Sequence, residues 1–156
     1  MREFKTHTHI SSNWLLRKLN FGFCVANHFF FPDTWSTQRI KVAKVHEMRH
    51  AIQQCQLGFG IHPWVGMLPF MLLYFLVFLP LGLAFFRMFF EYQSDRDEVT
   101  YLVETGRITN TGVLKYYIDE SAKTVSGYHY FFSCPLFITK LFYNRIFNDL
   151  RLKMKT

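Results

Sequence analysis

The chain has 156 residues, which is enough to bury a core of its own, and its length gives no reason to expect more than a single domain over residues 1–156. Half of the residues are hydrophobic and 19 are phenylalanine, which is high for a soluble domain of this size and suggests contact with lipid. The net charge of +7 favours an anionic membrane surface over nucleic acid, because no basic run is interleaved with aromatic residues in a recognisable nucleic-acid-binding module. The three cysteines, Cys24, Cys55 and Cys134, give no sign of a disulfide framework or a metal-ligand spacing, and they predict reduced thiols in a cytosol-facing protein.

The first predicted elements are a leader over residues 1–19 and a strand. The leader has no apolar run of signal-peptide length, so we expect no export by that route. We predict a solvated segment in which His7 and His9 could bind a metal adventitiously. The aromatic run from Phe21 to Phe31 ends at a proline and an aspartate, which predicts one strand that stops at a turn.

The next predicted element is a helix near residues 36–57, which begins at potential N-caps and ends at a glycine-containing loop. It contains two histidines four residues apart, with a glutamate directly after the first. On a helix, His46 and His50 lie one turn apart on the same face, so both imidazoles can bind one ion. A catalytic zinc site has three protein ligands and a water, and Glu47 beside the metal could take the proton of that water.

A hydrophobic segment of 24 residues without charge follows, from Pro63 to Phe86. It is long enough to cross a bilayer once. Its proline and glycine residues also allow a bend, so the segment could return as a re-entrant hairpin of two half-length helices or lie shallow in the membrane. The residues that allow this bend are Gly66, Pro69, Pro80 and Gly82.

A third helix is predicted from about Phe86 to Thr105, where Gly106 ends it. Glu91 and Asp95 are four residues apart and share one face of this helix. Glu91 can supply the third metal ligand. Asp95 suits a hydrogen bond to a metal-bound imidazole, because such a carboxylate fixes the tautomer of the ring.

His-Glu-x-x-His at residues 46–50, followed by Glu-x-x-Ser-Asp at residues 91–95, resembles the gluzincin metallopeptidases. Within them the chain is most similar to the membrane-associated HtpX-type and CAAX-prenyl-protease branch. The resemblance covers about residues 36–105, and the chain departs from it in its short length and in a serine where alanine is usual before the aspartate.

The resemblance implies a zinc-dependent peptidase in which the strand before the motif helix binds extended substrate. From propensity alone, a core strand without a substrate role fits Phe21 to Phe31 equally well. The family also uses a His, Tyr or Arg to stabilise the oxyanion, and His129, between two tyrosines, is the downstream candidate for that role.

Two further helices are predicted, one near Thr111 to Val125 and one that opens at Pro135. The last helix has apolar residues on one side and basic residues opposite. This pattern is typical of a membrane-surface helix, and also of a surface helix on a globular core.

The zinc site decides the expected topology. One ion cannot be bound from both sides of a membrane, so His46, His50 and Glu91 must lie on the same side. Basic residues on both flanks of residues 63–86 agree with two cytoplasmic ends. We therefore expect residues 63–86 to form a membrane-inserted helical hairpin between the two metal-ligand helices. The alternatives are a straight transmembrane helix with an accidental zinc motif, and an oligomer that buries this surface between subunits.

These patterns predict a mainly α fold with a minor β element, an α+β class, in the form of a minimal gluzincin-like metallopeptidase domain. The predicted protein binds Zn²⁺ through His46, His50 and Glu91 and hydrolyses peptide bonds of a peptide or protein substrate, with Glu47 as general base. It would work at or near membrane lipid with its active site facing the cytoplasm. The alternative function is a non-catalytic membrane structural or interaction protein whose motif residues pair on adjacent helices.

Overall fold

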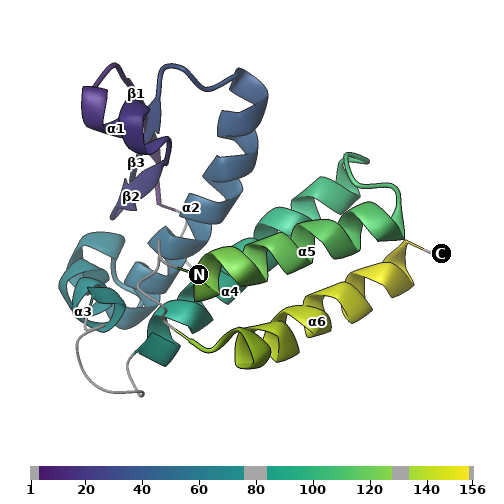
Figure 1. Cartoon of the computed structure of the whole chain (residues 1–156). Coiled ribbons are helices and arrows are strands. Elements are labelled where there is room, and N and C mark those ends of the chain that lie inside the picture. The colour runs from purple at the N-terminus through teal and green to yellow at the C-terminus, as the bar shows by residue number, and fades with distance from the viewer. Residues whose placement is uncertain (1–3, 76–83, 128–133, 155–156) are drawn as a thin grey trace. The chain divides into compact units, whose positions relative to one another are not determined.

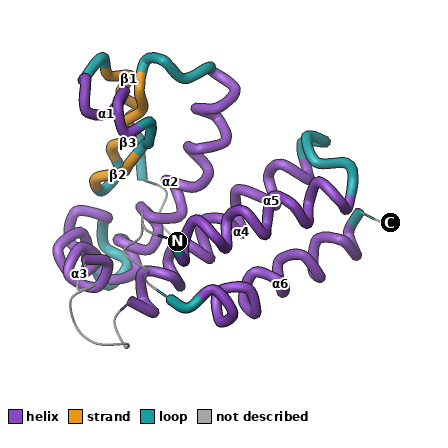
Figure 2. The backbone as a smooth tube through the Cα atoms, in the orientation of Figure 1, coloured by secondary structure: helices purple, strands orange, loops and turns teal. Residues whose placement is uncertain are grey.

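A computed structural model describes residues 4–75, 84–127 and 134–154. The chain divides into two compact units, Met1–Leu72 and Leu73–Thr156, and each is described here by itself. Among the described residues, every strand lies in the first unit, as Figure 2 shows. The fold is mainly helical with one small three-stranded sheet, which confirms the predicted α+β class at this level.

The first unit combines three short strands with three helices (Figure 1). In chain order they are β1 (His7–Ser11), α1 (Trp14–Leu19), β2 (Phe23–Val25), β3 (His28–Pro32), α2 (Thr37–Leu57) and α3 (Pro63–Phe75), of which the end of α3 lies beyond Leu72.

The sheet has the order β1-β3-β2, with β1 parallel and β2 antiparallel to β3. The prediction of one strand from Phe21 to Phe31 is wrong, because the chain turns back at Ala26 and Asn27 and forms a hairpin. Ala26 has a φ of 53°, in the left-handed region, and its N–H donates to Gln54 Oε1 at 2.9 Å. A residue of α2 therefore supports a turn that no glycine marks in the sequence.

The residues of the predicted solvated leader form β1 and α1, which the prediction did not include, and most of them are exposed to solvent. β1 pairs with β3 from His7 opposite His28 to Ser11 opposite Pro32. α1 begins after Asn13, whose Oδ1 accepts from the backbone N–H of Leu15 at 2.8 Å. β1 is mostly polar, so its own sequence gives only a weak strand signal. Pairing with β3 stabilises it as a strand.

α2 agrees with the predicted helix at residues 36–57 within one residue. Ser36 caps it, with its Oγ accepting from the backbone N–H of Arg39 at 3.2 Å. The aromatic rings of Phe29 and Phe31, on alternate positions of β3, are fully buried against Ala51 of α2. Burial of each ring contributes roughly 1.5–3 kcal/mol, so this cluster fixes α2 on the sheet.

α3 occupies the first part of the predicted membrane hairpin. Gly66 and Pro69 were expected to allow a bend, but both lie inside this helix. Residues 76–83, which include the other two expected bend residues, lie outside the described residues. No helix in the described part of the chain is both long and apolar enough to span a membrane.

The helices α4 (Ala84–Glu104), α5 (Thr111–Ser126) and α6 (Leu136–Lys153) make up the second unit. These three agree with the predicted helices to within a few residues. α5 and α6 run side by side and both contact α4 (Figure 1). The buried residues of these helices are mainly apolar, and they include Val99, Leu114, Ile118, Ala122, Val125, Tyr143, Ile146 and Leu150.

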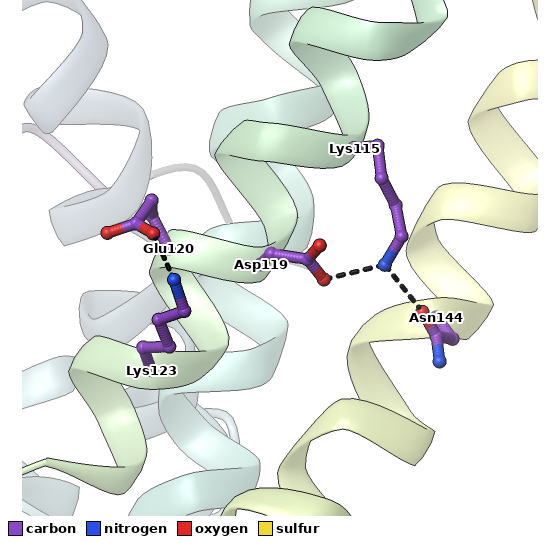
Figure 3. Close-up of polar contacts among 5 residues, drawn as sticks. All are labelled: Lys115, Asp119, Glu120, Lys123 and Asn144. Carbon is purple, nitrogen blue, oxygen red and sulfur yellow. Dashed lines mark hydrogen bonds and ion pairs between the residues drawn. The ribbon is translucent and has the colours of Figure 1, made fainter.

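Polar contacts link α5 and α6 at their solvent side (Figure 3). Lys115 Nζ donates to Asp119 Oδ1 at 2.6 Å and to Asn144 Oδ1 of α6 at 3.2 Å. Lys123 and Glu120 form a second ion pair within α5, at 2.6 Å. Exposed pairs of this kind contribute at most about 1 kcal/mol, so the apolar core holds the bundle together.

Candidate metal centre

His46 and His50 are the centre of the candidate site in the first unit. Their Nε2 atoms are 3.2 Å apart, and their ring planes are inclined by 75°. Two imidazoles bound to one tetrahedral zinc ion, with Zn–N bonds of about 2.0–2.1 Å, place their nitrogens about 3.3 Å apart. The two nitrogens, which are hydrogen-bonded to each other, are thus close enough to bind one ion.

Gln53 orients the second of these histidines. His50 Nδ1 lies 2.9 Å from Gln53 Oε1, one turn along α2, and both residues are buried. An amide oxygen only accepts, so the Nδ1 atom carries the proton and Nε2 is the unprotonated nitrogen of the ring, the kind that binds metals. Sequence reasoning missed Gln53, although its position three residues after His50 on the same helix is a signal that could have identified it.

The ring of His50 also has an apolar neighbour from α3. The ring of Phe70 meets it edge to face, with centroids 5.7 Å apart. Glu47, the predicted general base, is on α2 directly after His46 and is buried. The first unit thus contains the two histidines, the glutamate next to His46 and the phenylalanine ring that contacts His50.

In the second unit, α4 carries a row of carboxylates on one face. Glu91, Asp95 and Glu98 are spaced by four and three residues, and Glu91 is 1% exposed. Each carboxylate accepts a hydrogen bond from a tyrosine hydroxyl of a different helix. The pairs are Tyr74 with Glu91, Tyr143 with Asp95 and Tyr117 with Glu98.

A tyrosine hydroxyl that donates to one carboxylate oxygen fixes the orientation of the whole carboxylate. Tyr143, on α6, donates to Asp95 Oδ2 at 2.5 Å, and Tyr74 donates to Glu91 Oε1. Sequence reasoning missed both tyrosines, because they lie far from Glu91 and Asp95 in the sequence and no regular spacing links them.

The predicted site residues thus fall into two groups. His46 and His50 come together in the first unit with Glu47 beside them, and Glu91 and Asp95 share one face of α4 in the second. Glu91 as third ligand and Asp95 as the partner of an imidazole stay predictions. His129 lies outside the described residues.

Compared with known proteins, the chain matches no family model, no curated protein and no solved structure. Any functional assignment therefore depends on the chemistry of the residues described above.

Proposed function

We propose that the protein is a zinc-dependent peptidase that works at a membrane, with zinc held by His46, His50 and Glu91. The observation that carries the proposal is the pair of Nε2 atoms 3.2 Å apart on α2, with a buried glutamate directly after the first histidine. This donor set fits zinc, which accepts imidazole nitrogens and carboxylate oxygens and keeps a fourth position open in catalytic sites.

Zinc bound at this site would supply a Lewis acid for the scissile carbonyl and a water with a pKa of about 7. Glu47 accepts the proton of the attacking water and delivers it to the nitrogen of the leaving amine. Gln53 orients His50 by accepting a hydrogen bond from its Nδ1–H. We assign the same orienting role toward a metal-bound imidazole to Asp95, whose carboxylate also accepts from Tyr143.

Exposed apolar side chains of the first unit support the membrane part of the proposal. They gather on α3 and on the loop before it, where Phe59 is 91% exposed. The sequence from His50 to Phe86 contains no Asp, Glu, Lys or Arg. Soluble monomers rarely expose so large an apolar patch. The patch consists of Phe59, Ile61, Trp64, Val65, Leu68, Met71 and Leu72.

α3 has 13 residues and is about 20 Å long, shorter than the roughly 30 Å of a hydrocarbon core. We therefore propose shallow insertion into the cytoplasmic leaflet, with the active site on the cytoplasmic side. Flotation with anionic vesicles checks this part of the proposal: wild type should float, and a Trp64→Ser, Leu68→Ser variant should float less. Equal flotation of the two would argue against insertion of α3.

The catalytic assignment is tested by the Glu47→Gln variant. Glu47 is the base and not a ligand in the proposed site, so this variant should keep zinc in elemental analysis and lose peptidase activity. His50→Ala should lose both, because it removes a ligand.

Equal zinc content together with equal proteolysis in wild type and Glu47→Gln would overturn the catalytic assignment. Absence of bound zinc from purified and zinc-treated wild type would leave the non-catalytic membrane protein as the better reading.

A further inference from the structure

Three of the seven histidines gather on the sheet of the first unit, apart from the candidate metal centre. His7 lies directly opposite His28 in the parallel pair β1–β3, and His9 is two residues further along β1, so all three share one face. The ring of His28 stacks on His7 with centroids 4.8 Å apart and on His9 with centroids 5.2 Å apart.

The nitrogens of two of these rings are hydrogen-bonded to each other, since His9 Nε2 lies 2.9 Å from His28 Nδ1. A metal ion that takes the place of the shared proton would be bound by both nitrogens, and imidazole nitrogens suit Cu²⁺ and Ni²⁺.

We propose that this cluster is a second metal site, in which His9 Nε2 and His28 Nδ1 bind one Cu²⁺ ion, or Ni²⁺ with lower affinity, and His7 stacks against His28. The preference follows the general order of affinities of divalent metals for nitrogen ligands. Because the two ligands come from β1 and β3, the bound ion would cross-link the edge strand β1 to the hairpin and stabilise the folded state.

The test titrates Cu²⁺ alone into the full chain carrying His46→Gln and His50→Gln, so that the proposed zinc site does not compete. Trp64, whose ring centroid is 6.0 Å from that of His28, reports binding through quenching of its fluorescence. We expect one equivalent of Cu²⁺ to bind and to raise the melting temperature.

Loss of an outer-shell partner typically weakens metal binding by about 10–100-fold. His9→Gln and His28→Gln each remove a direct ligand, so each should weaken Cu²⁺ binding by more than that. His62→Gln is the matched control, because His62 lies next to the same tryptophan, with its Nδ1 3.3 Å from the backbone nitrogen of Trp64, and outside the cluster. It should leave the affinity unchanged.

If the double variant does not fold, wild type saturated with one equivalent of Zn²⁺ takes its place. Binding of Cu²⁺ that is as tight in His9→Gln and His28→Gln as in their parent would overturn the second site, and so would the absence of saturable binding. Neither result bears on the proposed zinc site, which uses other residues.

Discussion

Gln53 and Gln54 are consecutive buried residues of α2 with different partners. Gln53 Oε1 accepts from His50, and Gln54 Oε1 accepts from the backbone N–H of Ala26 in the β2–β3 turn, each at 2.9 Å. Neighbouring residues on a helix point about 100° apart, so one amide can serve the metal ligand while the next serves the sheet. Gln53 therefore orients His50, and Gln54 stabilises the turn of the sheet.

Substitution of these two glutamines should separate the two effects. Gln53→Leu should weaken zinc binding by about 10–100-fold, because the His50 ring loses the acceptor that orients it. Gln54→Leu should instead lower the free energy of unfolding by about 1–3 kcal/mol, because the Ala26 N–H is left without its acceptor. Chelator competition measures the first quantity and urea denaturation the second. Equal zinc affinities in the two variants would remove Gln53 from the site.

Arg17 and Asp33 form an ion pair between α1 and the turn that precedes α2. Arg17 Nε donates to Asp33 Oδ1 at 2.7 Å, and a second bond joins the guanidinium to Oδ2. This hydrogen bonding lowers the pKa of Asp33 below its ordinary value of 3.8. The pair therefore stabilises the folded state above that value, and the contribution is lost as the pH falls through the folded-state pKa.

A pH series on Arg17→Gln checks this linkage. The variant should be less stable than wild type at pH 7, and the difference should shrink as the pH falls below 3.8 and through the folded-state pKa of Asp33. Urea midpoints at several pH values measure it. A difference that stays constant across this range would show that Arg17 acts through packing and not through the carboxylate.

At the scale of elements, α2 and α3 meet at Gly66. A Cβ atom on this residue would lie 1.6 Å from the carbonyl oxygen of Gln54 and 2.5 Å from the nitrogen of Gly58. The absence of a side chain therefore permits the close crossing of the two helices. Phe70 lies one turn further along α3, on the same face, and the crossing brings its ring against His50.

Gly66→Ala tests this crossing. Helix propensity alone would make alanine about 1 kcal/mol more favourable, but the clash with α2 should dominate and lower the free energy of unfolding by about 1–3 kcal/mol. The control is Val65→Ala, because Val65 is half exposed, and the change should be within about 0.5 kcal/mol. Stabilisation by Gly66→Ala in urea denaturation would contradict the close approach of the helices.

The helices could be predicted from sequence because their limits are local. Ser36 caps α2, Gly58 follows it, and Gly106 with a φ of 69° follows α4. The strands could not, because the turn at Ala26 is supported by a side chain 28 residues away and β1 is defined by its pairing with β3. Where the local sequence pattern was weak or misleading, contacts between residues far apart in the sequence determined the secondary structure.

At the scale of the whole molecule, the proposed zinc site combines His46 and His50 with Glu91. The sequence could identify His46 and His50, because two ligands one turn apart on one helix leave a regular spacing. It could not identify the tyrosines that hold the α4 carboxylates, because those come from separate helices. A single metallopeptidase domain over residues 1–156 and Glu91 as its third metal ligand stay predictions.

Zinc affinities of Glu91→Ala, Asp95→Ala and Glu98→Ala, measured by chelator competition, test the proposed zinc site most directly. All three residues lie in the same row on α4 and accept from a tyrosine, although Glu91 is buried and the other two are partly exposed. We predict that Glu91→Ala loses the most affinity, that Asp95→Ala loses about 10–100-fold as an outer-shell partner, and that Glu98→Ala changes it least. Zinc binding that is unaffected by Glu91→Ala, or weakened more by Asp95→Ala, would contradict a site built from His46, His50 and Glu91.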